Sequence, residues 1–185
     1  MVGTFREPSG GRRVSPIHSI YYSVAQPLER GFKNYYSIIQ GKTMKSRLVV
    51  LTDICRGLEN DDIESMVRLL LYSNEINLEG LIAATSCWAK KAATEKERKL
   101  ILKIVNAYAC VRENLSIHAD GYPDPDGLRR KVCCGVAKYG RCLGDGFGEA
   151  SLNESDGVRL IIDAADQNDE RPLWIAIWSG ANTLA

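Results

Sequence analysis

The chain has 185 residues, of which 45% are hydrophobic and 25% are charged. This length fits one globular domain, and the composition excludes an intrinsically disordered chain, a collagen-like repeat and a disulfide-stapled miniprotein. The 24 basic and 23 acidic residues nearly cancel, so no overall field favours nucleic acid or an anionic membrane as the partner. The apolar runs are far shorter than the roughly 20 residues that a membrane-spanning helix needs.

The first 45 residues differ from the rest of the chain. They carry seven Lys or Arg residues against two Glu residues and show no helical or strand period. We therefore predict a poorly ordered basic leader over 1–45 and an α/β domain over 46–185. The leader lacks the apolar core of a secretory signal. A solvated tail and an organelle transit peptide both remain open as interpretations.

The six cysteines form no Cys-x-x-Cys pair, and the chain has only two histidines. This pattern indicates neither a structural zinc site nor a disulfide framework. Reduced thiols favour a cytoplasmic location.

From residue 47 onward, strand and helix patterns alternate. Short β-branched apolar runs predict strands, and apolar residues spaced three or four apart predict helices. Alternation of this kind is typical of a mostly parallel sheet with helices on its faces. In chain order we predict a strand at 47–52, a helix at 61–72, a strand at 78–83, a helix at 93–112, a strand at 115–118, a turn-rich loop at 120–127, a helix at 156–165, a strand at 172–178 and a helix that opens at 179.

The loop after the first strand carries the strongest candidate site. Asp53 ends that strand, and Asp61 and Asp62 begin the next helix. In parallel sheets, ligands bind at the carboxyl ends of the strands. Clustered carboxylates repel one another unless a cation lies between them, and calcium prefers oxygen ligands. Helix capping, including a box formed by Asp61 and Glu64, is the alternative for the helix residues, but it does not explain Asp53.

Several segments together resemble a known family. They include LVVLTD ending at Asp53 and the NDD run ending at Asp62. Further matching segments are SMVRLLLYSNE at 65–75, EGLIA at 79–83, GYP at 121–123, RPLW at 171–174 and WSGANTLA at 178–185. Over residues 46–185 the chain resembles the inosine-uridine type nucleoside hydrolases, and more closely their nucleoside hydrolase-like branch sometimes labelled cellulose-binding.

This resemblance implies a Rossmann-like α/β fold, a calcium cofactor and hydrolysis of N-glycosidic bonds. It implies that Asp53 is both a calcium ligand and the general base. Asp62 and the backbone carbonyl of Ser179 would be further calcium ligands. Asp61 would bind ribose hydroxyls, and Asn182 is another candidate substrate contact. Trp88, in a loop at a strand end, is a candidate for stacking on a sugar or base.

The chain also departs from that family. Seven residues separate Asp53 from Asp61, more than in the related proteins. The family's last aspartate ligand and its catalytic histidine belong to a carboxyl half that this chain lacks. We therefore expect a truncated form and a possible homo-oligomer, with a nucleoside or sugar as the ligand. A non-catalytic carbohydrate-binding protein on the same fold is the alternative function.

Overall fold

The computed structural model describes residues 21–23, 44–55, 60–140 and 155–185. A five-stranded sheet has the order β1-β5-β2-β3-β4. The strands β5, β2, β3 and β4 are parallel, whereas β1 pairs antiparallel with β5. Their bounds are β1 Tyr21–Ser23, β2 Ser46–Thr52, β3 Ile76–Ala83, β4 Val132–Cys134 and β5 Leu173–Ile177. The predicted mostly parallel α/β sheet is thus confirmed.

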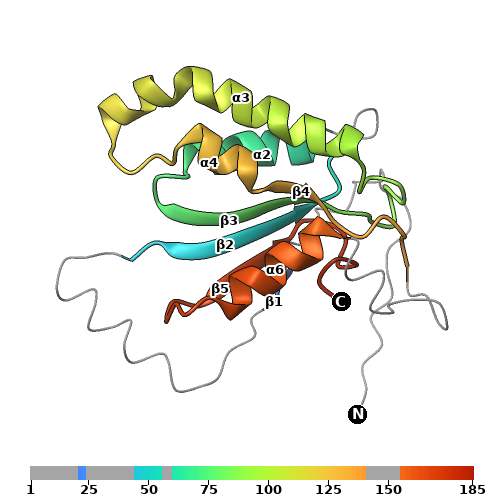
Figure 1. Cartoon of the computed structure of the whole chain (residues 1–185). Helices are drawn as coiled ribbons and strands as arrows, with labels where there is room; N and C mark the ends of the chain where they lie inside the picture. The colour runs from blue at the N-terminus through green and yellow to red at the C-terminus, as the bar shows by residue number, and fades with distance from the viewer. Residues whose placement is uncertain (1–20, 24–43, 56–59, 141–154) are drawn as a thin grey trace, which may run out of the picture.

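Helices cover both faces of this sheet (Figure 1). On one face lie α2 (Asp61–Leu71), α3 (Glu95–His118) and α4 (Pro125–Arg130), and on the other lies α6 (Asp156–Asp166). No helix in the described part of the chain is long and apolar enough to cross a membrane.

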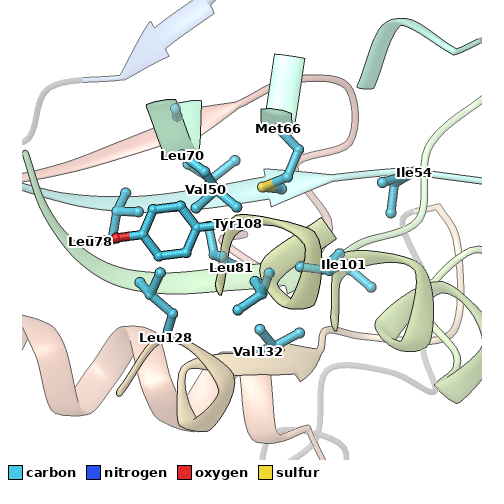
Figure 2. Close-up of a cluster of buried hydrophobic side chains, with 13 residues drawn as sticks. Val50, Ile54, Met66, Leu70, Leu78, Leu81, Ile101, Tyr108, Leu128 and Val132 are labelled. Atoms are coloured by element: carbon cyan, nitrogen blue, oxygen red, sulfur yellow. The ribbon is translucent and has the colours of Figure 1, made fainter. Parts of the chain in front are cut away.

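Two apolar cores fix the helices on the sheet. In the larger one, Val50 and Leu81 of the sheet lie against Met66 of α2 and against Ile101 and Tyr108 of α3 (Figure 2). The smaller one packs Ile161 and Ala164 of α6 against the opposite face of β2 and β3. Because β2 is buried on both faces, its sequence reads as a continuous apolar run, as expected for a central parallel strand.

Three predicted elements were wrong. Residues 115–118 are the last turn of α3, and they continue the helix because no Gly or Pro occurs between the start of α3 at Glu95 and Asp120. The predicted loop at 120–127 contains the start of α4, where Asp124 accepts a hydrogen bond from the backbone N–H of Gly127 and Pro125 occupies the first turn. In place of a helix opening at 179, the chain forms a turn in which the N–H groups of Leu184 and Ala185 donate to the carbonyl of Ala181.

Two further strands had not been predicted. β4 has only three residues, too few to show a period, although Val132 and Cys133 are buried. β1 lies inside the predicted leader, where a three-residue segment pairs with β5. The remainder of 1–43 lies outside the described residues.

Candidate functional site

The centre of the candidate site is Asp53, at the carboxyl end of β2. Its side chain is almost fully buried. Ser86, which follows the neighbouring strand β3, donates a hydrogen bond from its Oγ to Oδ2 of Asp53. Because β2 and β3 are adjacent and parallel, their ends lie at the same edge of the sheet. The sheet topology therefore brings together two polar residues that are 33 positions apart.

Ser86 also shapes the loop after β3. Its Oγ accepts hydrogen bonds from the backbone N–H groups of Trp88, at 3.1 Å, and Ala89, at 2.9 Å. The backbone N–H of Ser86 donates in return to the carbonyl of Ala89. The hydroxyl thus holds a tight turn with its lone pairs and orients Asp53 with its proton. Ser86 was not among the predicted site residues.

Asp62, in the first turn of α2, is the second carboxyl group at this edge. It lies close enough to Asp53 and Thr52 for both side chains to influence its pKa. Burial, the hydrogen bond to Asp53 and the negative charges of Asp53 and Asp61 raise the pKa of Asp62 to about 8. Two carboxyl groups held this closely cannot both ionise easily without a cation.

Asp61 does not join this pair. Its side chain is exposed, and its Oδ1 accepts a hydrogen bond from the backbone N–H of Asp62. The residue at the N-cap of α2 is Asn60, without a side-chain cap, so the predicted Asp61–Glu64 capping box is wrong. Within the described ranges, no group of three or more Asp, Glu, His or Cys side chains is placed to hold a metal ion. Two of the three predicted carboxylates therefore converge.

The loop after β5 carries Ser179 and Asn182. Ser179 is exposed, and the next residue, Gly180, packs so closely on the loop after β3 that a Cβ there would lie 1.7 Å from the carbonyl oxygen of Thr85. This contact places the loop at the same sheet edge as Asp53. The side-chain amide of Asn182 donates a hydrogen bond to the carbonyl of Lys138 at 2.9 Å. This hydrogen bond connects the loop after β5 to the segment that contains Lys138.

The backbone of Trp88 is linked to the site through Ser86, and 69% of the residue's surface is exposed. It lines a hollow of about 400 Å³, together with Cys55 of the loop after β2 and residues at the start of α3. Burial and the nearby charge of Asp53 raise the pKa of the Cys55 thiol. An exposed indole at the rim of a hollow is suited to stacking on a sugar or base.

The donor chemistry of this edge fits a hard divalent cation. The groups that converge are carboxyl and hydroxyl oxygens, which are the ligands that calcium prefers. A cation between Asp53 and Asp62 would relieve the repulsion that now favours a proton on Asp62. Asp53 and Asp62 are the two residues that would hold such an ion.

The mostly parallel α/β sheet agrees with a nucleoside hydrolase-like class, and the comparisons with known proteins show that class. The family described as "Cellulose-binding Sde182, nucleoside hydrolase-like domain" matches residues 47–185, and the chain belongs to this family. A solved structure of a nucleoside hydrolase-related hypothetical protein from Saccharophagus degradans, associated with carbohydrate metabolism, is 39% identical, with a TM-score of 0.64. The match covers 76% of this chain and 32% of that one. No curated protein matches the chain.

Proposed function

We propose that the carboxyl edge of this sheet binds calcium and hydrolyses the N-glycosidic bond of a nucleoside or a related sugar compound. The observation that carries the proposal is the pair of interacting carboxyl groups, Asp53 and Asp62, at the end of the central strand, where Asp53 is buried and accepts a hydrogen bond from Ser86. Capping of α2 does not account for this pair, because Asn60 occupies the cap and Asp53 belongs to a different element.

In this proposal Asp53 and Asp62 would hold the ion, and the carbonyl of Ser179 would be a further ligand, as the family resemblance suggests. Calcium, when bound, supplies a positive charge that lowers the pKa of the attacking water. The carboxylate of Asp53 takes the proton from that water, and Ser86 keeps the carboxylate in one orientation. The water oxygen bonds to the anomeric carbon, the C–N bond breaks, and the departing base takes its electrons and a proton from solvent.

The surrounding residues would hold the sugar. Asp61 presents an exposed carboxylate next to the pair, and it can accept hydrogen bonds from ribose hydroxyls. The indole of Trp88 offers a face for stacking at the rim of the hollow. Fixing the sugar in this way favours an oxocarbenium-like transition state near negative charge.

The test combines calcium titration with a sugar-release assay on inosine and uridine, using the whole chain. Asp53→Asn and Asp62→Asn should each weaken calcium binding by about tenfold or more, because each removes a charged ligand. Asp53→Asn should also lower kcat by at least the ~10² typical of a lost general base. Asp163→Asn, exposed on α6, is the matched control and should change neither measurement.

Unchanged calcium binding in both site variants would overturn the metal site. Absence of sugar release with calcium present would overturn the hydrolase activity. In the second case, a non-catalytic carbohydrate-binding role becomes the better explanation, and the exposure of Trp88 favours it. Retention of the chain on insoluble cellulose without sugar release would support that second function.

A further inference from the structure

The hollow beside Trp88 has an unusual charge for a site next to two carboxyl groups. Three lysines and one glutamate line it: Lys90, Lys91, Lys96 and Glu97. Glu97 is buried and already engaged, since it accepts a hydrogen bond from Thr94 and forms an ion pair with Lys96 at 3.8 Å. The lining therefore carries an excess of positive charge that Glu97 does not neutralise.

The excess is concentrated at Lys90 and Lys91. The ammonium of Lys90 lies 5.8 Å from the centroid of the Tyr139 ring, a cation–π contact that leaves its charge uncompensated. Among the residues that the structure describes, neither lysine forms an ion pair with a carboxylate. Both side chains are exposed and remain available to a ligand.

Two residues that line the hollow, Cys55 and Trp88, are close to the acidic pair in the chain or through a hydrogen bond. Cys55 lies two positions after Asp53 and interacts electrostatically with both Asp53 and Glu97. Trp88 is held by Ser86, the same residue that donates to Asp53. A ligand with its sugar at Asp53 and Trp88 would therefore extend toward the lysines.

We propose that this hollow binds the anionic group of a negatively charged sugar ligand, such as a sugar phosphate or a uronate. The inference rests on the proposed function for the position of the sugar and adds the charge of the substrate. A neutral sugar needs no unpaired ammonium groups, whereas an anionic one approaching Asp53 and Asp62 meets repulsion. Lys90 and Lys91 offset that repulsion and attract the ligand to the hollow.

The test is calorimetric titration of the whole chain, in calcium, with ribose 5-phosphate, glucuronate and ribose. Ribose 5-phosphate should bind about tenfold more tightly than ribose, with a preference that shrinks as salt is added. Comparing the affinity of glucuronate with that of ribose 5-phosphate shows whether the hollow binds a carboxylate as tightly as a phosphate. Lys91→Glu and the double variant Lys90→Ala/Lys91→Ala should remove the preference and leave ribose binding unchanged. Lys103→Glu, exposed on α3, is the control and should retain the preference.

Equal binding of ribose and both anionic sugars would overturn the inference, as would a preference that survives both lysine variants. Failure of all three ligands to bind would also overturn it. These outcomes are distinct from failure of the proposed function, because binding is measured without turnover. If the chain releases sugar from neutral nucleosides but does not prefer anionic sugars, the proposed hydrolase activity stands and the anionic subsite is rejected.

Discussion

At the scale of single residues, the candidate site depends on two aspartates, each of which stands next to an element boundary. Asp53 directly follows an apolar run, and Asp62 directly precedes a helical period. Ser86 could not be predicted in the same way, because its partner depends on β2 and β3 being neighbours in the sheet. Its hydroxyl connects the two loops only after long-range strand pairing has placed them.

The raised pKa of Asp62 makes stability depend on pH. Its ordinary value is 3.8, and burial together with Asp53 moves it to about 8. Between these values the folded chain holds a proton that the unfolded chain has released, so the free energy of unfolding falls as pH rises. The contribution is complete below about pH 4 and lost above about pH 8. Without calcium, Tm should therefore decrease across this window.

Asp62→Asn should flatten this part of the Tm profile, because its amide does not titrate. Calcium should raise the Tm of the wild type most at high pH, where binding displaces no proton. A Tm series against pH, with and without calcium, measures both effects, and Asp163→Asn should keep the wild-type slope. An unchanged slope in Asp62→Asn would assign the pH dependence to another group.

At the scale of elements, long periodic segments were predictable and short ones were not. Enough residues to show a period are present in the helices α2 and α6 and in the strands β2, β3 and β5. β4 owes its place to pairing with β3, and α4 to a capping aspartate and a proline that also occur in turns. Local sequence signals are degenerate over three to six residues, and tertiary contacts then decide the conformation.

The loop after β5 depends on the absence of a side chain at Gly180. A Cβ there would lie 1.7 Å from the carbonyl oxygen of Thr85, so Gly180→Ala must displace one of the two loops. We expect a loss of at least ~2 kcal/mol in the free energy of unfolding. Urea unfolding measures it. Calcium affinity should fall as well if Ser179 is a ligand.

Gly127→Ala is the control for this substitution. Gly127 lies in α4, where the nearest atom to an added Cβ is 3.6 Å away. Alanine favours a helix over glycine, so stability should stay the same or rise by up to ~1 kcal/mol. Equal effects of the two substitutions would show that the Gly180 contact does not constrain the loop.

At the scale of the whole molecule, a buried arginine holds the sheet and α6 together at the edge opposite the acidic pair. Arg47, at the start of β2, is 2% exposed. It donates to Glu79 of β3 at 3.1 Å, to Gln167 at 3.0 Å and to the carbonyl of Ala164. The sequence did not predict this network, because a charged residue at the start of a strand is usually exposed. Arg47 is buried only by the packing of α6 against the sheet.

Removing Arg47 should therefore destabilise the entire domain. Arg47→Ala leaves Glu79, 8% exposed, without its charged partner, and loss of one member of a buried pair typically costs about 3–5 kcal/mol. Replacing both partners, as in Arg47→Met with Glu79→Leu, should recover much of the loss because no buried charge remains unpaired. Arg129→Ala breaks an exposed pair with Asp126 and should cost less than about 1 kcal/mol. Urea unfolding of the four proteins compares them directly. If Arg47→Ala costs no more than Arg129→Ala, the burial of this network contributes nothing to the cohesion of the sheet with α6.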